Sequence, residues 1–287
     1  MNNIRFGRNY KLTIGLSTTE SNAIIVTPPL TLRFDVNRNT MASANTATFT
    51  IINLAEKTRR LIYQDRYDTT TYRQIILEAG YGNNLATIFK GQIRQAYSKR
   101  AGTEWETTVD CWDAYGMING FSSITYAANV DIKQMINKCC SDMPYTETPI
   151  ISTTLEKKYN RGIVLFGNSW KLTKTLLPLY YQMYIDNNKP IVTKFQEYLY
   201  TDIPVLNSDM GLLETPRRND ASLEVKILFY PTVSVGQAIA LKSLETIYNS
   251  QYKIMGIHHQ GVISEAVGGE CSTTLSLWLG TQLLKVT

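Results

Sequence analysis

The segment from Ser222 to Gly236 (SLEVKILFYPTVSVG) constrains the fold more than any other part of the chain. Apolar and polar residues alternate from Leu223 to Ile227, with the period of two that is typical of a β-strand with one buried face. Pro231 ends this strand because proline cannot donate a ladder hydrogen bond. A second strand is predicted at Thr232–Val235, and Gly236 supplies a backbone that is free to turn.

Strand patterns dominate both ends of the chain. In the C-terminal part, Tyr252–Ile257 and Thr273–Trp278 add two strands, so a closed or nearly closed small sheet is expected there. In the N-terminal part, strands are predicted at Tyr10–Gly15, Leu30–Val36, Thr46–Leu54, Gln74–Ala79, Thr87–Gln95 and Glu104–Trp112. One helix, at 55–64, interrupts them. This pattern favours a small barrel or sandwich and does not fit alternating parallel β/α units.

The middle of the chain has a different character. Asp131–Met143 and Ser169–Tyr181 show helical spacing of apolar residues, with Ser169 as the candidate N-cap of the second helix. Pro178 falls inside that second run and leaves its end open. Met183–Val192 then reads as a strand, a tight turn and a strand. A compact α+β segment is therefore expected between the two β-rich parts.

The predicted fold class is mainly β with an α+β insertion, in which two small tube-like antiparallel β-barrels are joined by a compact α+β region. The predicted domains are 1–116 for the first barrel with its inserted helix at about 55–64, 117–205 for the α+β region, and 206–287 for the second barrel. The second barrel is free to borrow strands from 117–130.

Composition excludes several classes of protein. The chain has 287 residues, of which 44% are hydrophobic and 18% charged, so a packed core is expected rather than disorder. The formal charge of +5 is dispersed. The one tight basic cluster, Lys57, Arg59 and Arg60, lies on the predicted helix, where a solvated face is the simplest explanation. Sequence-specific nucleic-acid binding would need a denser basic stripe.

The residue types that carry chemistry are sparse. His258 and His259 are adjacent on a predicted strand and point to opposite faces, so they cannot grip one metal ion together. The four cysteines, Cys111, Cys139, Cys140 and Cys271, lack metal-ligand spacing and are expected to be buried free thiols in a reducing cytosol. We therefore predict no catalytic residues, no cofactor-binding residues and no metal ligands, and hence no cofactor.

Other motifs have structural explanations. Gly80–Leu85 begins like a phosphate-binding glycine motif but lacks the third glycine and a following helix, so a hairpin turn is predicted. Glu104, Glu106 and Asp110 share an alternating strand and are expected to be solvent-exposed. The tryptophans Trp112, Trp170 and Trp278 are expected to anchor the cores.

Several segments resemble, in order, the baseplate hub proteins of Mu-like and other long-tailed bacteriophages. The first block of that family is matched by Phe49–Thr58, Glu78–Tyr81 and Ile88–Ile93, and the closing block by Gly211–Pro216, Tyr230–Gly236, Tyr252–Ile254, His258–Gly261 and Thr273–Leu275. Each piece alone is weak, but the ordered set covers most of the chain.

The resemblance implies a homotrimer with two tube-like barrels per subunit, so that six similar barrels match a sixfold tail tube and the trimer matches a threefold spike. The implied partners are further copies of the chain, the tail tube or tube-initiator protein, the central spike and other baseplate proteins. Phage DNA would pass through the lumen without sequence-specific binding. The implied location is the tail baseplate of the virion, after synthesis in the bacterial host cytoplasm.

Two alternatives remain open at this point. A tail-associated cell-wall hydrolase would need two acids that converge in space, which no sequence pattern excludes. A receptor- or carbohydrate-binding β protein at the tail tip would be compatible with the 18 tyrosines. No apolar run is long enough to span a membrane, and the N-terminus lacks the apolar core of a signal peptide.

Overall fold

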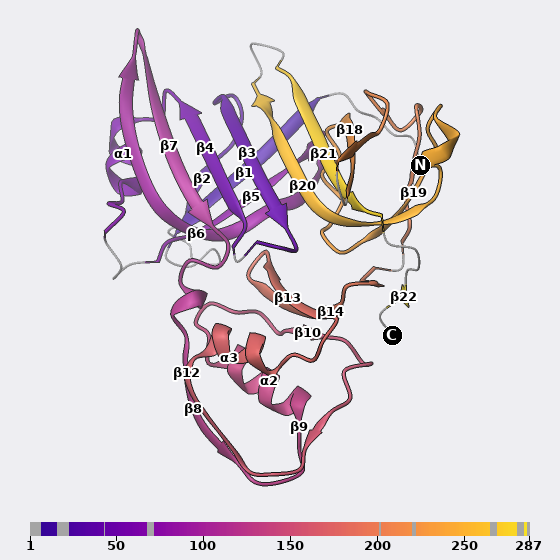
Figure 1. Cartoon of the computed structure of the whole chain (residues 1–287). Helices are drawn as coiled ribbons and strands as arrows, with labels where there is room; N and C mark the ends of the chain where they lie inside the picture. Colours follow the sequence, from indigo (N-terminus) through magenta and orange to yellow (C-terminus); the bar gives the residue numbers. More distant parts are fainter. Residues whose placement is uncertain are drawn as a thin grey trace.

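The computed structural model describes residues 7–15, 23–42, 44–67, 72–200, 202–219, 222–264, 269–279 and 284–285. The chain is mainly β with an α+β insertion, as predicted (Figure 1). The N-terminal part holds β1 (Arg8–Gly15), β2 (Ile24–Val26), β3 (Leu32–Asn39), β4 (Thr46–Ile52), α1 (Glu56–Ile62), β5 (Gln74–Tyr81), β6 (Asn84–Ala101) and β7 (Glu104–Trp112).

The α+β insertion lies below the sheet in Figure 1. It holds η1 (Met117–Asn119), β8 (Phe121–Tyr126), β9 (Val130–Asp131), α2 (Ile132–Ser141), β10 (Ile150–Ile151), β11 (Lys158–Tyr159), β12 (Ile163–Asn168), α3 (Ser169–Leu176), β13 (Tyr181–Asp186), β14 (Lys189–Lys194) and β15 (Glu197–Tyr198). The C-terminal part holds β16 (Val205–Leu206), β17 (Arg217–Asn219), β18 (Ser222–Leu228), β19 (Ala238–Leu241), η2 (Thr246–Tyr248), β20 (Gln251–Ile263), β21 (Cys271–Trp278) and β22 (Leu284–Lys285).

The N-terminal sheet bends at the long strand β6. The first half of β6 pairs with β5 and the second half with β7, and the two partners meet at Gln92. Gly91 stands at this bend because a Cβ there would lie 2.6 Å from the carbonyl oxygen of Trp112. A bulge between Ile93 and Gln95 accompanies the change of partner. The bend lets β1 and β5 pass behind β3 and β4 in Figure 1 and enclose a core between them.

The two β-rich parts share one sheet. β3 pairs antiparallel with β20 over the whole of β3, from Leu32 opposite Ile263 to Asn39 opposite Gly256. Among the described strands, the order runs β17-β18-β21-β20-β3-β4-β7-β6-β5-β1-β2, with β16 and β19 attached beside β20. We call the β3–β20 pairing the seam. Through the seam, backbone hydrogen bonds join the two predicted barrels into one sheet. The strand order begins at β17 and ends at β2, and these two strands do not pair with each other.

Three hydrophobic clusters fill the molecule. One lies within the N-terminal sheet around Phe49 and Phe89, with Phe229 added from the C-terminal part. The second packs α2 and α3 against the middle strands around Trp170. The third lies within the C-terminal sheet around Ile254, and it includes Tyr184 from β13. Each cluster is built mainly from residues that are near in sequence, with a few side chains crossing to the next part.

Several local predictions are confirmed. β7 has the predicted bounds, and Asp131 caps α2 by accepting a 2.8 Å hydrogen bond from the Lys133 amide. The glycine motif is a hairpin between β5 and β6, with Gly82 at a positive φ. The tight turn after β13 is Asn187–Asn188, both at positive φ, a conformation that asparagine tolerates.

Two local predictions are wrong. Thr232–Val235 is not a strand, although Val233 and Val235 are buried in alternation, because the Ser234 amide bonds the Gln237 side chain instead of a neighbouring strand. An alternating apolar pattern thus indicates which side chains are buried, but it does not show that the segment pairs with another strand. The N-cap of α3 is Asn168 rather than Ser169, because the Asn168 side chain accepts from the Lys171 amide.

The segment 117–130, which the second barrel was left free to use, stays with the middle region. Its strand β8 pairs with β12 of the middle region along its full length, so the C-terminal sheet borrows nothing from it. The second helix candidate is also shorter than predicted. α3 ends at Leu176, two residues before Pro178, which could not continue the backbone hydrogen-bond pattern.

A buried ionic network joins the N-terminal sheet to the middle region. Arg38 of β3 donates two hydrogen bonds to Asp186 of β13, from Nε at 2.8 Å and from Nη2 at 2.6 Å. Asn45 donates from its side chain to both Asp113, at 2.7 Å, and Asp186, at 3.3 Å. All four side chains are buried. Burial raises the pKa of Asp113 well above its usual range, and the nearby Asp186 carboxylate adds to this shift.

The turn after Asp186 docks on β6. Asn187 accepts from the backbone amide of Lys90 at 2.8 Å, and Asn188 accepts from the Gln92 side chain at 3.0 Å. The Lys90 ammonium also pairs with Glu147 of the middle region. The β13–β14 hairpin is therefore held to the sheet by polar contacts at its tip, next to the bend at Gly91.

Replacing Arg38 with methionine should destabilise the protein by about 3–5 kcal/mol, because Asp186 would lose its buried counter-charge. Urea unfolding followed by circular dichroism measures this change. The control is Arg33→Met, which removes an exposed pair with Glu106 and should cost about 1 kcal/mol or less. Equal losses for the two variants would contradict the importance of the buried network.

Candidate functional site

One face of the shared sheet is polar across both β-rich parts. Alternate residues of six neighbouring strands point away from the hydrophobic cores, and the strand register aligns them in rows, such as His258 opposite Asn37 and Asn37 opposite Thr46. We call this the polar sheet face. Its members are Arg33, Asp35, Asn37, Thr46, Thr48, Thr50, Glu106, Thr108, Asp110, Glu224, Lys226, His258, Gln260, Thr274 and Ser276.

Charges on the polar sheet face are mixed, and its four acids outnumber Arg33 and Lys226. Glu106 accepts from Arg33 at 3.0 Å and lies 3.5 Å from the Lys99 ammonium. Asp110 accepts from Thr48 at 3.0 Å, and Asp35 lies 3.1 Å from His258 Nε2. Such exposed pairs contribute little to stability. They do, however, leave the face with a mixed charge and no surplus of cations.

Glu106 and Asp110, two acids of this face, are set well apart along one strand. Glu106 and Asp110 are four residues apart on β7, which separates their backbones by about 13 Å at roughly 3.3 Å per residue. Glycoside hydrolases hold their two carboxyl groups about 5–9.5 Å apart. Glu104 is exposed as predicted, whereas Glu106 and Asp110 are half-buried and already hold the partners described above.

The two histidines lie on opposite faces of β20, as predicted. His258 is on the polar sheet face, and His259 is fully buried with Nδ1 2.9 Å from the Thr273 hydroxyl. Burial lowers the pKa of His259 well below its usual value, so the ring is neutral near pH 7. A hydroxyl beside a neutral imidazole is the pairing used in nucleophilic catalysis, but Thr273 is also buried and a substrate cannot reach it.

The cysteines are free and buried, as predicted. Burial raises the pKa of Cys140 to about 12, and it also raises the pKa values of Cys111, Cys139 and Cys271, so all four remain unreactive thiols near neutral pH. Across the described ranges, no three His, Cys, Asp or Glu side chains come together in a way that could hold a metal ion. In the same ranges, no helix has the length and apolarity needed to cross a membrane.

Lys253 is the one lysine with a strongly lowered pKa among the described residues. Burial lowers the pKa of its ammonium to about 8, the direction seen for catalytic lysines. Its Nζ, however, donates at 3.2 Å to the carbonyl oxygen of Phe195, in the segment between β14 and β15. Glu197 lies near it and is itself buried, bonded to Ser152 and Thr154. Lys253 therefore ties β20 to the middle region and faces no open cavity.

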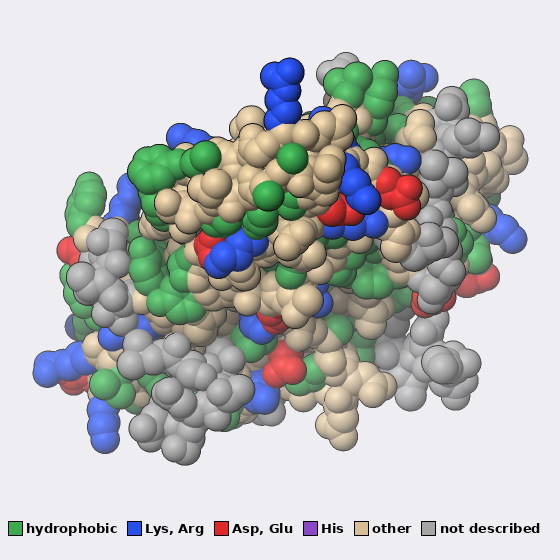
Figure 2. Space-filling model, turned by 90° about the horizontal axis from the view of Figure 1, so that it is seen from below, with side chains coloured by type: hydrophobic (Ala, Val, Ile, Leu, Met, Phe, Trp, Pro, Cys, Tyr) green, Lys and Arg blue, Asp and Glu red, His purple; other side chains and the backbone are tan. Residues whose placement is uncertain are grey.

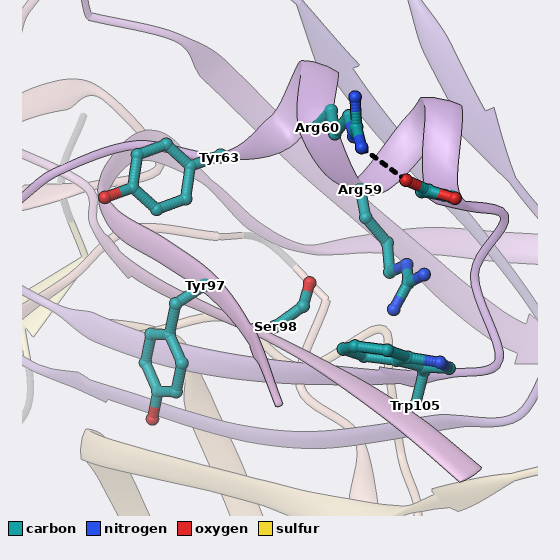
Figure 3. Close-up of a pocket in the computed structure, with 7 residues that line it drawn as sticks. Arg59, Arg60, Tyr63, Tyr97, Ser98 and Trp105 are labelled. Carbon is teal, nitrogen blue, oxygen red and sulfur yellow. Dashed lines mark hydrogen bonds and ion pairs between the residues drawn. The ribbon is translucent and has the colours of Figure 1, made fainter. Parts of the chain in front are cut away.

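The basic cluster on α1 is more structured than a solvated face. The Arg59 guanidinium lies over the Trp105 ring, 3.8 Å from its centre, and Arg60 pairs with Glu56 at 2.6 Å (Figure 3). Of the tryptophans expected to anchor cores, Trp170 is buried, but Trp112 and Trp278 are only half-buried.

Basic side chains do not gather into a stripe on the face seen from below. Figure 2 shows Lys and Arg side chains lying apart from one another there, several of them beside Asp or Glu. Together with the mixed charge of the polar sheet face, this agrees with the sequence-based exclusion of a nucleic-acid-binding stripe, for the surfaces that the structure describes.

The sequence did not identify the polar sheet face as one surface. Alternation in β3 and β7 predicted its rows one strand at a time, but the seam that joins them pairs residues more than two hundred positions apart. A usable signal was present in β3, where Arg33, Asp35 and Asn37 alternate with apolar residues. In β20 the corresponding His258 and Gln260 flank another polar residue, His259, so the alternation is not visible in the sequence there.

Comparison with known families decides what this architecture is. The family model described as baseplate hub gp41 matches residues 11–264, which includes both β-rich parts and the insertion between them. The chain belongs to the baseplate hub gp41 family. This confirms the resemblance to phage baseplate hub proteins and implies a place in the tail baseplate. Among curated proteins, none matches the chain.

Solved tail proteins have the same fold. The 43 kDa tail protein of prophage MuSo2 from Shewanella oneidensis is 8% identical, with a TM-score of 0.64 over 93% of this chain and 96% of that one. A tail protein from Neisseria meningitidis is 10% identical, with a TM-score of 0.60 over 95% and 97%. An E. coli type VI secretion component, described as similar to the T4 tail proteins gp27 and gp5, is 10% identical, with a TM-score of 0.55 over 88% and 74%.

Lys253 gives a pH-dependent prediction. Its pKa is about 8 in the folded protein and about 10.4 in an unfolded chain. The unfolded state therefore binds more protons, and this group makes stability rise with pH between these values. Between pH 7 and 9.5 the wild type should gain about 2 kcal/mol of unfolding free energy from this group. Lys253→Met lacks the group and should not show this gain.

Urea unfolding of both proteins at several pH values measures this difference, and tyrosine ionisation, which is common to both, cancels in it. Lys189→Met, at a half-exposed lysine, serves as the control and should show no such trend. A difference between the wild type and Lys253→Met that does not change with pH would contradict the assignment.

Proposed function

We propose that this baseplate hub protein is a homotrimer that adapts the sixfold tail tube to the threefold central spike and lines the channel for the genome. The observation that carries the proposal is the seam. It joins two β-rich parts of similar kind into one sheet within each subunit. Three such subunits around an axis present six β-rich parts, which is the number a sixfold tube needs, while the trimer itself keeps the symmetry of a threefold spike.

The proposed division of the chain into three units follows the hydrophobic clusters. We propose 1–116 and 206–287 as the two tube-like units and 117–205 as the α+β unit between them. The three clusters centre on these segments, although a few side chains cross over. The tube or tube-initiator protein, the spike and other baseplate proteins are the proposed partners, with the protein made in the host cytoplasm and assembled into the virion.

The polar sheet face is the proposed lining of the channel. It crosses the seam without interruption, and its cation Arg33 is already paired with Glu106 within the subunit. DNA is held by uncompensated Lys and Arg that neutralise phosphates. A hydrated face rich in Thr, with more acids than bases, would let DNA slide past without holding it.

We propose that the protein acts by shape and is not an enzyme. The buried Thr273–His259 pair, the backbone separation of Glu106 and Asp110 on β7, and the engagement of Lys253 support this. The hydrolase alternative would require purified protein to clear peptidoglycan. The receptor-binding alternative would require the isolated chain to compete with phage adsorption.

A trimer is the first expected outcome. Sedimentation of the purified protein at micromolar concentration should give three times the chain mass, because hub interfaces of this kind bury large obligate surfaces. A protein that stays monomeric over this range, alone and with its tube and spike partners, would contradict the trimer.

Introducing positive charge into the polar sheet face tests the channel. Thr46→Arg combined with Thr108→Arg should leave folding and assembly intact but reduce phage infectivity by at least about tenfold, because the added cations would hold the passing phosphate backbone. Complementation of a phage that lacks this protein measures infectivity. Thr175→Arg, on the exposed side of α3, is the matched control. Normal infectivity of the double variant would argue against a DNA-lining role.

A further inference from the structure

A groove lies between α1 and the β6–β7 hairpin. It has a volume of roughly 610 Å³ and is lined by Glu56, Arg59 and Arg60 from α1, by Tyr63, and by Tyr97, Ser98 and Trp105 from the hairpin. Figure 3 shows Arg59 stacked over Trp105 on one side of the groove, with Tyr63 and Tyr97 on the other side. Tyr63 is exposed, and Tyr97 and Trp105 are partly exposed. The groove thus combines a cation with an open aromatic slot.

Arg59 carries a charge that no acid of its own subunit neutralises among the described residues. Its guanidinium lies over the Trp105 ring and forms no ion pair there, whereas its neighbour Arg60 pairs with Glu56 at 2.6 Å. Stacking on Trp105 holds the guanidinium in place. Its Nε is buried, so a carboxylate arriving from outside would meet the terminal Nη atoms.

The loop between β19 and β20 carries complementary chemistry. Leu244 is 98% exposed and Ile247 79% exposed, and the exposed acid Glu245 lies between them. The loop is held in shape by Asn249, which accepts from the Ser243 amide at 2.7 Å and donates to the Ser243 carbonyl oxygen at 3.2 Å. Apolar side chains displayed so fully on an ordered loop indicate a contact surface.

We propose that the groove of one subunit receives the Leu244–Ile247 loop of a second copy of this chain. In this contact Glu245 meets Arg59, and the two aliphatic side chains fill the slot between Tyr63 and Tyr97. The inference rests on the proposed trimer and identifies one of its contacts.

The placement of the two surfaces supports a closed ring. α1 lies at the left end of Figure 1, and β19, which leads into the loop, lies at the right end. One subunit therefore cannot fill its own groove. A head-to-tail contact between different surfaces generates a ring when the rotation closes. With one groove and one loop per subunit, every surface is used once in a closed trimer.

Charge reversal tests the pairing. Arg59→Glu and Glu245→Arg should each weaken trimer formation at least about tenfold, and combining them in one chain should restore it to within about threefold of the wild type. Sedimentation over a dilution series measures assembly. Lys57→Glu, on α1 but outside the groove, and Glu156→Arg, in the middle region, are matched controls that should assemble normally.

Cross-linking tests proximity directly. The native cysteines are buried, so an introduced surface thiol can be addressed selectively. Ser98→Cys in one copy and Thr246→Cys in another should be joined by a short bis-maleimide only when the two variants are mixed and co-assembled.

The outcomes separate this inference from the trimer itself. A wild-type trimer that tolerates both charge reversals and gives no mixed cross-link would overturn the loop-in-groove contact and leave the hub proposal standing. Singles that weaken assembly without restoration in the double variant would likewise place Arg59 and Glu245 in different contacts. A wild-type protein that forms no trimer, with or without its tail partners, would overturn both.

Discussion

The bidentate contact between Arg38 and Asp186 sets the relation between the sheet and everything below it. It is buried, and it lies where β3, the β13–β14 hairpin and Asp113 meet. A buried pair of this kind adds little net stability compared with apolar packing, but breaking it leaves a charge stranded. The contact therefore acts mainly on specificity. It favours the orientation of the middle region in which the Asp186 carboxylate meets the Arg38 guanidinium.

Lys253 makes a comparable buried contact between the C-terminal sheet and the middle region. There the C-terminal sheet meets the segment that holds Phe195 and Glu197, again through a buried polar contact. Within each unit the packing is apolar, whereas both junctions add buried polar contacts, which are directional, to the apolar side chains that cross them. The α+β region is thus attached to the sheet at several points, and the hydrogen-bond geometry of Arg38, Lys253 and the Asn187–Asn188 turn constrains its orientation.

Local patterns in the sequence predicted most of the strands, and the bounds of β7 were predicted at both ends. They could not predict the seam, because an alternating strand shows which side is buried but not which strand lies beside it. Thr232–Val235 shows the same limit, since its valines are buried without any ladder. The sequence did contain a signal for the Arg38 contact. Arg38 follows Leu32, Phe34 and Val36 on the inward side of β3, where a cation demands a partner. That partner, 148 positions away, could not be named from spacing alone.

The seam also bears on how such proteins diverge. Its hydrogen bonds join main-chain groups, which every residue except proline supplies, so its geometry imposes few demands on side-chain identity. Substitutions can accumulate along β3 and β20 as long as the inward positions stay apolar and the outward ones stay polar. This is one physical reason why chains with only 8–10% identical residues retain a common architecture over more than nine-tenths of their length. A fold held by main-chain pairing can therefore persist through sequence change that leaves few identical side chains.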